Sequence, residues 1–347
     1  MDWTDRHCRY FMRRFTPSAL LYTEMVTAAA IVHGDANRFL RFNDAEHPVA
    51  LQLGGSEPDW MARATAVANE YGYDEININV GCPSDRVQSG RFGACLMADP
   101  ALVAQCLSAM QAESDAPVTV KSRIGIDDHD SYDFLVAFVE PLAEAGCRKF
   151  VVHARIAVLE GLSPKENRSV PPLDYERVYR LKQDFPDLEI VLNGGIESCA
   201  EVDAALGRVD GVMIGRRAYH QPDFLAELER HLHPDWQPPA RSDIVERMLP
   251  YIEEQLGEGV ALNAITRHML GLFAGQPGAR AWRRYVSEHA HRPGSGSEVL
   301  VNALNAMPAA ARADTMTGPA AARTQANHER HVRTETPDDG RTGRHSW

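Results

Sequence analysis

The chain has 347 residues, 44% hydrophobic and 24% charged, which is typical of a globular protein with one large core or two smaller ones. It contains no apolar run near the roughly 18 residues of a membrane span, and its N-terminus lacks a signal-peptide pattern. Its six cysteines lie far apart without a C-x-x-C pair, which disfavours a zinc site and a secreted disulfide framework, so we expect a cytoplasmic protein without metal.

The charge is distributed unevenly along the chain. The net charge of −12 disfavours binding to nucleic acid when it is taken as a whole. Residues 263–292, however, hold five arginines and one acid, whereas residues 1–262 hold 25 basic and 41 acidic groups, a net −16. An acidic body with a basic C-terminal module can bind a polyanion through one face.

Short β-rich runs alternate with longer amphipathic stretches over the first two thirds of the chain. Amphipathic helices are predicted at 58–72 and 100–113. Strands are predicted at 19–25, 49–55, 75–81, 118–125, 149–155, 190–195 and 211–216. This alternation predicts an α/β fold, a parallel sheet covered by helices, which closes into a (β/α)8 TIM barrel of about 250 residues.

A TIM barrel needs eight strands, and seven runs are found. Helices of ordinary length fill the intervals between these runs, so we expect the first strand to be missing at the N-terminus and to precede Met1. The residues that follow, DWTDRHCRYFMRRF, are typical of a loop and helix that come after a strand.

After about residue 235 the strand pattern stops. Helices are predicted at 241–259, 261–275 and 279–291, with Gly and Pro between them. We therefore divide the chain into a barrel (1–236), a small all-helical domain (237–307) and a disordered tail (308–347) that has almost no large apolar side chains.

The carboxyl ends of barrel strands form the active-site face. The residues at these ends are polar or glycine: Gln52, Asn79, Cys82, Lys121, Arg123, His153, Arg155, Asn193, Gly194, Gly195, Gly215 and Arg216. Asn-Gly-Gly alone also suits an ordinary turn, but with Gly-Arg at the next strand end it favours a phosphate site. A lysine in mid-barrel stabilises anionic charge, although a Schiff base or a salt bridge would also suit it.

Several long segments resemble the tRNA-dihydrouridine synthases, and most closely their A subfamily. These segments are NVGCPSDRVQSGRFGACLM (79–97), VTVKSRIGIDD (118–128), VVHAR (151–155), GLSPKENR (161–168), NGG with GVMIGR, and ITRHMLGLFAGQPGARAWRRYVSE (265–288). The resemblance covers nearly all of residues 1–307. Members usually begin with a strand that ends in Ala-Pro-Met before Asp-Trp-Thr-Asp-Arg, of which only Met1 is present here.

The resemblance implies an enzyme that uses FMN, reduced by NADPH, to saturate the uracil C5–C6 bond of U20 and U20a in the tRNA D-loop. It assigns Cys82 as the proton donor to C5 after a hydride reaches C6. The implied FMN contacts are Met1, Gln52, Lys121, His153, Asn193, Gly194, Gly195, Gly215 and Arg216. The implied tRNA contacts are Asn79, Arg91, Lys165, Arg168, Arg283 and Arg284. We expect a monomer, and we expect the other five cysteines to be inert.

Two other readings stay open. A flavin barrel that acts on a small ene or pyrimidine would have no use for the basic helical domain. The second is that the chain is a catalytically impaired remnant that still binds tRNA, because loss of a strand would expose two sheet edges and remove flavin contacts. The presence of Cys82, Lys121 and His153 favours the enzyme.

Overall fold

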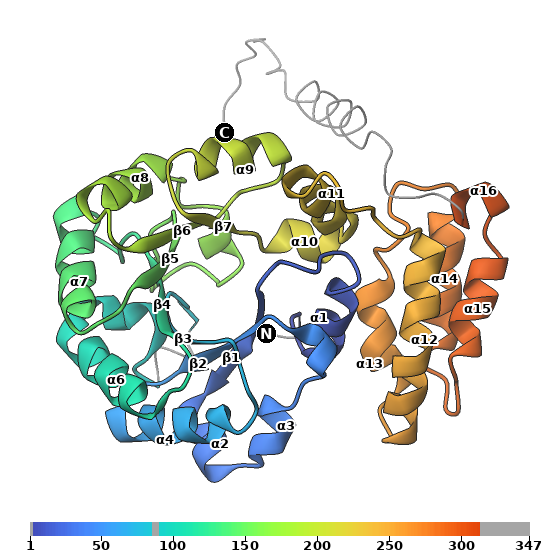
Figure 1. Ribbon diagram of the computed structural model, residues 1–347, viewed down its shortest axis with the longest axis horizontal. Helices are drawn as coiled ribbons and strands as arrows, with labels where there is room; N and C mark the ends of the chain where they lie inside the picture. The colour runs from blue at the N-terminus through green and yellow to red at the C-terminus, as the bar shows by residue number, and fades with distance from the viewer. Residues whose placement is uncertain (1–2, 85–89, 313–347) are drawn as a thin grey trace, which may run out of the picture.

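The computed structural model describes residues 3–84 and 90–312, so the expected cofactor contact Met1 lies outside the described residues. Seven parallel strands form one curled sheet in which each strand pairs with the next along the chain (Figure 1). The strands are β1 (Leu21–Thr27), β2 (Val49–Gly54), β3 (Glu75–Val80), β4 (Val118–Arg123), β5 (Lys149–His153), β6 (Glu189–Asn193) and β7 (Gly211–Met213). The predicted α/β barrel architecture, with seven strands over the described residues, is confirmed.

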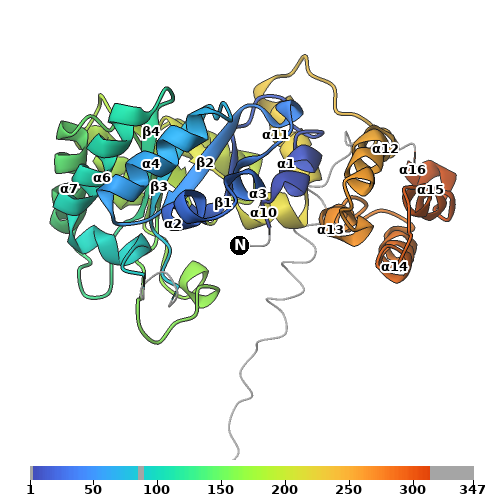
Figure 2. The same ribbon diagram turned by 90° about the horizontal axis from the view of Figure 1, so that it is seen from below.

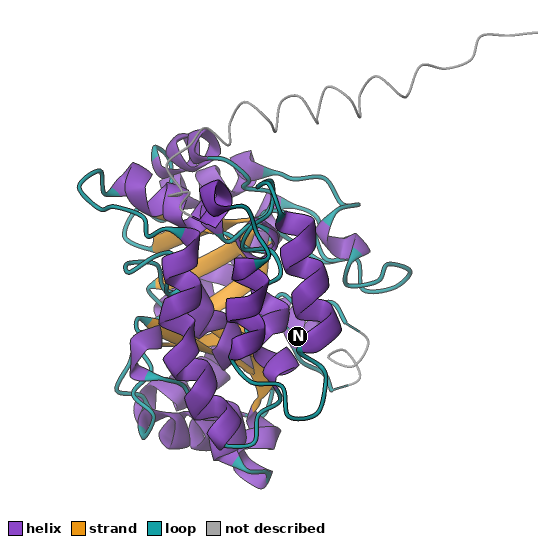
Figure 3. Ribbon diagram, turned by 90° about the vertical axis from the view of Figure 1, so that its right-hand side faces the viewer, coloured by secondary structure: helices purple, strands orange, loops and turns teal. Residues whose placement is uncertain are grey.

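Helices surround the sheet because its strands are buried on both faces (Figure 3). All six residues of β3, the segment EININV, are buried. The helices of this region are α1 (Arg6–Met12), α2 (Ala28–His33), α3 (Ala36–Leu40), α4 (Pro58–Asn69), α6 (Pro100–Glu113), α7 (Tyr132–Glu144), α8 (Tyr175–Asp184), α9 (Cys199–Leu206), α10 (Arg216–His220) and α11 (Asp223–Leu232). Both helices predicted there are present, as α4 and α6.

The register of the sheet separates two polar ends of the barrel interior. At the amino ends of the strands, Lys149 Nζ lies 3.0 Å from Glu75 Oε2 and 3.1 Å from Glu189 Oε1. At the carboxyl ends, Arg123 is level with His153, and His153 is level with Asn193. Parallel pairing therefore brings the predicted site residues to one face of the barrel.

The C-terminal helices form a second apolar cluster that includes part of the barrel. They are α12 (Arg241–Gly257), α13 (Leu262–Thr266), α14 (Ala279–His289), α15 (Glu298–Asn305) and α16 (Ala309–Arg312). Their cluster, which includes the fully buried Trp282, also contains Phe11 of α1, Phe15 just after α1, and Leu225 of α11. This region therefore lies beside the barrel and packs on α1 (Figure 2).

Two details of the C-terminal region differ from the sequence expectation. The single helix expected at 261–275 is wrong: α13 ends at Thr266, and a 3-10 turn (Arg267–Met269) follows it. Gly271 lies against α10 there, since a Cβ would come within 3.0 Å of the His220 carbonyl oxygen. At the start of the expected tail the chain is still helical, because α16 lies there and buries Ala311. The rest of the expected tail lies outside the described residues.

No helix within residues 3–84 and 90–312 is long and apolar enough to cross a membrane.

Candidate active site

The Cys82 turn begins immediately after β3, and Asn79 holds its backbone. The Asn79 Oδ1 accepts hydrogen bonds from the backbone N–H groups of Gly81 (3.1 Å) and Cys82 (2.9 Å). The Asn79 Nδ2 donates to Gln52 Oε1 at 2.7 Å, which connects the turn to β2. The Cys82 carbonyl accepts from the Ala94 N–H at 2.9 Å, and its half-buried Sγ lies 3.6 Å from Ser84 Oγ. The thiol is therefore held by a fixed turn at the barrel mouth.

Arg123 supports the same turn from β4. Its buried guanidinium donates to the carbonyl oxygens of Gly81 (3.2 Å), Ile156 (3.1 Å) and Asn167 (2.9 Å). Burial, more than any neighbouring charge, lowers the pKa of Arg123 to about 10, so the group stays charged at neutral pH. Arg123 thus joins the Cys82 turn to the loop after β5 and adds positive charge beside it.

Lys121 and His153 lie in a strongly cationic part of the mouth. Burial, and then the nearby Arg123, lowers the pKa of Lys121 to about 8. Burial also lowers the pKa of His153, assisted by Arg123, Lys121, Arg155 and Arg216. His153 is therefore a neutral imidazole, and its buried Nδ1 has no hydrogen-bond partner among the residues that the structure describes.

Among the described residues, no carboxylate forms an ion pair with the cationic groups at this mouth, which are Lys121, Arg123, Arg155, Arg168 and Arg216. A concentration of positive charge of this kind suits an anionic ligand. The unpartnered His153 Nδ1 adds one polar contact that the protein leaves open.

The two glycine segments at the ends of β6 and β7 differ in their surroundings. Gly194 and Gly195 have φ of +113° and +74°, which other residues rarely adopt, and the Tyr175 hydroxyl donates to the Gly194 carbonyl at 2.6 Å. A Cβ on Gly215, by contrast, would meet no atom within 4 Å, so its backbone faces open space. The Arg216 guanidinium lies beside it and donates to the Arg168 carbonyl at 3.0 Å.

Asn193 has a structural contact that the sequence did not indicate. Its Nδ2 donates to the Met213 carbonyl at 2.8 Å, and its own carbonyl accepts from Ala154 at 2.9 Å. It therefore joins β6 to β7 and to Ala154, the residue after β5.

The expected RNA contacts lie mostly on exposed surface. Arg91, Lys165 and Arg168 are exposed on loops that follow β3 and β5. Arg283 and Arg284 are exposed on α14, whose buried face carries Trp282. Asn79 is the exception, because it is buried and its carbonyl oxygen is already engaged by the Cys82 turn.

Comparison with known proteins identifies the family of this chain. The sequence profile of the dihydrouridine synthase (Dus) family matches residues 1–308. The chain belongs to the dihydrouridine synthase family. Relatives called tRNA-dihydrouridine(20/20a) synthase include those of Vibrio parahaemolyticus (60% identical over 310 residues, 89% of this chain and 95% of the relative) and Synechocystis sp. (58% over 307 residues, 88% and 92%).

A third dihydrouridine synthase, from Escherichia coli O6:H1, carries the same name and is 56% identical over 309 residues, 88% of this chain and 92% of the relative. Among solved structures, a 2-naphthoyl-CoA reductase complex shares 11% identity and a TM-score of 0.47 over 67% of this chain and 47% of that chain. That likeness is too weak to support an inference.

Proposed function

We propose that the chain is a cytoplasmic, monomeric tRNA-dihydrouridine synthase that reduces the uracil C5–C6 bond of U20 and U20a, with FMN as cofactor and NADPH as reductant. The name shared by relatives 56–60% identical over nearly the whole chain supports the substrate. The observation that carries the chemistry is the Cys82 thiol, held by Asn79 at a cationic barrel mouth.

The residues at the mouth fit FMN. Gly215 and Arg216, with Gly194 and Gly195 behind them, would hold the phosphate on open backbone and a guanidinium. His153 would offer its unpartnered Nδ1 to the cofactor. Gln52 would present its amide N–H group to the edge of the heterocycle, because its carbonyl oxygen already accepts from Asn79.

Lys121 would supply positive charge beside the flavin ring, where negative charge develops during reduction. The chemistry that bound FMN, reduced by NADPH, would supply here is a hydride for C6 of the uracil. Cys82 then donates its proton to C5, and solvent restores the proton on the sulfur. The sum is one hydride and one proton added across one double bond.

The tRNA would contact exposed arginine and lysine side chains around this mouth. A uracil must leave its stack to reach Cys82, as enzymes that act on bases require. In this proposal residues 1–236 carry the chemistry and residues 237–307 bind tRNA through Arg283 and Arg284. Arg91, Lys165 and Arg168 would contact the RNA close to the flipped base, with the second amide hydrogen of Asn79 directed to the base itself.

The first test is the visible absorption spectrum of the purified, desalted chain after titration with FMN. Retention of a flavin spectrum, together with loss of dihydrouridine formation in Cys82→Ala that keeps the same spectrum, would support the proposal. If the folded chain retained no flavin at any FMN concentration, the cofactor assignment would be wrong.

A further inference from the structure

A row of polar side chains crosses the interior of the barrel from its floor, at the amino ends of the strands, to its mouth. Side chains two residues apart on a strand point to the same face. On β3, Glu75, Asn77 and Asn79 therefore share the interior face, and they are 4%, 0% and 8% exposed. Bulky branched side chains usually fill a barrel interior. The polar groups that take their place here each need a hydrogen-bond partner.

The hydrogen bonds of this row form one series through β2, β3 and β4. Asn79 Nδ2 donates to Gln52 Oε1 at 2.7 Å, and Gln52 Nε2 donates to Asn77 Oδ1 at 3.5 Å, the longest of these contacts. Asn77 Nδ2 donates to Thr119 Oγ1, and Thr119 Oγ1 donates to Glu75 Oε1, both at 2.8 Å. We call this series the interior network; its members are Glu75, Thr119, Asn77, Gln52 and Asn79.

Every hydrogen bond of the interior network runs in one direction, with the donor on the side of the mouth and the acceptor on the side of the floor. At the mouth, Asn79 Oδ1 accepts from the backbone N–H groups of Gly81 and Cys82, so the other atom of this amide must donate toward the floor. At the floor, the ionised Glu75 carboxylate can only accept. The two ends therefore require the same direction, and reversal of any amide between them would set donor against donor.

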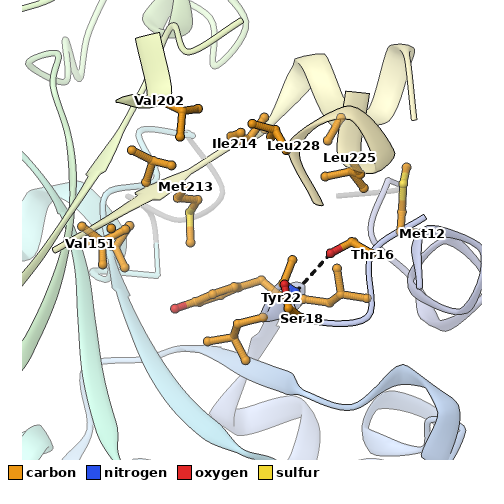
Figure 4. Close-up of a pocket in the computed structure, with 18 of the residues that line it drawn as sticks. Met12, Thr16, Ser18, Tyr22, Val151, Val202, Met213, Ile214, Leu225 and Leu228 are labelled. Carbon is orange, nitrogen blue, oxygen red and sulfur yellow. Dashed lines mark hydrogen bonds between the residues drawn. The ribbon is translucent and has the colours of Figure 1, made fainter. Parts of the chain in front are cut away.

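Two donors at the floor hold Glu75 in its accepting role. Lys149 Nζ lies 3.0 Å from Glu75 Oε2, and the Tyr22 hydroxyl donates to Glu75 Oε1. Burial, and then the charge of Glu75, raises the pKa of Tyr22, so this hydroxyl keeps its proton. Figure 4 shows the Tyr22 ring extending from β1 into a cavity of about 630 Å³ that Lys149 and Val151 of β5 also line.

We propose that Glu75 is a positioning residue for the Cys82 turn, because its carboxylate sets the direction of the interior network and so the orientation of the Asn79 amide. Glu75 lies about 13 Å from Asn79 along β3 and acts through the groups between them. The same direction leaves Gln52 with an amide hydrogen, not an oxygen, for the mouth. The catalytic consequence rests on the proposed function, in which Cys82 donates the proton.

Glu75→Gln tests the direction because it changes the chemistry of the floor and little of its shape. The introduced amide has a single oxygen, which the charged Lys149 attracts more strongly than a neutral hydroxyl does. Its NH2 group then faces Thr119, whose proton must turn toward Asn77. The conflict passes along the interior network until the Asn79 amide can no longer accept from both backbone N–H groups.

The measurement is hydrogen exchange of the backbone N–H groups of Gly81 and Cys82 in the full chain as purified. Glu75→Gln should speed their exchange by about tenfold or more. Glu189→Gln is the matched control, because Glu189 Oε1 lies 3.1 Å from the same Lys149 and Glu189 is not a member of the interior network. The control should change the exchange by less than about twofold.

Two second-site changes separate positioning from a general loss of structure. Asn77→Ala cuts the interior network between floor and mouth. Added to Glu75→Gln, it should return the exchange of Gly81 and Cys82 to within about twofold of the unsubstituted chain. Lys149→Met removes the charge that attracts the introduced oxygen, so it should have the same effect. If Glu75→Gln merely destabilised the barrel, either added change would make the exchange faster still.

Single-turnover formation of dihydrouridine measures the catalytic consequence. With saturating FMN, Glu75→Gln should reduce turnover by about tenfold at unchanged tRNA affinity, and added Asn77→Ala should restore it. Faster exchange without loss of turnover would contradict the role of Cys82 in the proposed function and would support the direction of the interior network. Because the exchange measurement needs no substrate, the two failures can be told apart.

The exchange measurement decides the proposal. Equal exchange in Glu75→Gln and Glu189→Gln, or no recovery with either second change, would overturn it. If Glu75→Gln did not fold alone, recovery of the fold and of slow exchange by added Lys149→Met would support it. Failure of Lys149→Met to restore that fold would overturn it.

Discussion

Replacing Asn79 with alanine should remove the support of the Cys82 turn while leaving the thiol in the chain. The substitution deprives three groups of their partners: the N–H of Gly81, the N–H of Cys82 and the Oε1 of Gln52. At about 1 kcal/mol for each lost hydrogen bond, the free energy of unfolding should fall by roughly 3 kcal/mol. The thiol would then sample positions away from the substrate, and a misplacement of about 1 Å reduces turnover by about 100-fold.

The assay is single-turnover formation of dihydrouridine in tRNA by enzyme that has been saturated with FMN and reduced. Asn79→Ala should keep flavin binding and lose turnover. Asn79→Asp keeps two acceptor oxygens for the turn and loses only the donation to Gln52, so it should recover most of the stability. Asn77→Ala is the matched control, because Asn77 lies on β3 like Asn79 but contacts neighbouring strands. Its amide donates to Thr119 Oγ1 of β4 at 2.8 Å and its Oδ1 accepts from Gln52 Nε2 of β2 at 3.5 Å, and no hydrogen bond joins it to the described residues of the Cys82 turn. Turnover of Asn79→Ala equal to that of Asn77→Ala would refute this reasoning.

Three further predictions concern the mouth and the fold. FMN affinity, measured by flavin fluorescence, should weaken as the pH rises through about 8, because Lys121 then loses its proton and no longer attracts the anionic cofactor. Lys121→Arg should remove this pH dependence. Gly215→Ala should fold normally and bind FMN weakly, because a Cβ there meets no atom within 4 Å but would face the ligand. Gly195→Ala should lose about 1–3 kcal/mol of stability, because Gly195 has a φ of +74° and a Cβ there would lie 2.5 Å from Leu173. Burial lowers the pKa of His7 from the ordinary 6.5 to about 4. Between pH 4 and pH 6.5, His7 is therefore protonated in the unfolded chain and neutral in the folded chain. Stability should therefore fall, by at most about 3 kcal/mol, as the pH falls from 6.5 to 4, and His7→Gln should flatten this part of a urea-denaturation profile.

The sequence predicted that most of the candidate site residues share one face of the barrel, because this placement follows from parallel strands. Residues at the carboxyl ends of adjacent parallel strands must share one face, so Lys121, His153 and Asn193 could be brought together from their positions alone. The alternation of apolar runs and amphipathic helices likewise predicted the sheet.

The contacts that the sequence did not reveal depend on loops that fold back over the barrel. In the sequence Arg123 is simply an arginine at the end of a predicted strand. Its contacts with Ile156 and Asn167 could not be predicted, because they form only when the loop after β5 folds over the barrel. The role of Asn79 in the turn could not be predicted from the sequence, because its partners are two backbone N–H groups, which nearly every residue type has. The break after α13 depends on close packing of Gly271 against the His220 carbonyl, a tertiary contact that helical periodicity does not contain.

The most direct test of the proposed function is the dihydrouridine content of unmodified tRNA incubated with the FMN-loaded chain and NADPH, measured beside Cys82→Ala that carries the same amount of flavin. We predict that the unsubstituted chain forms dihydrouridine in the D-loop and oxidises one NADPH for each residue formed, and that Cys82→Ala forms almost none. Equal dihydrouridine formation by both proteins would contradict the assignment of Cys82 as proton donor. NADPH oxidation without dihydrouridine by the flavin-loaded, folded chain would contradict the proposed substrate.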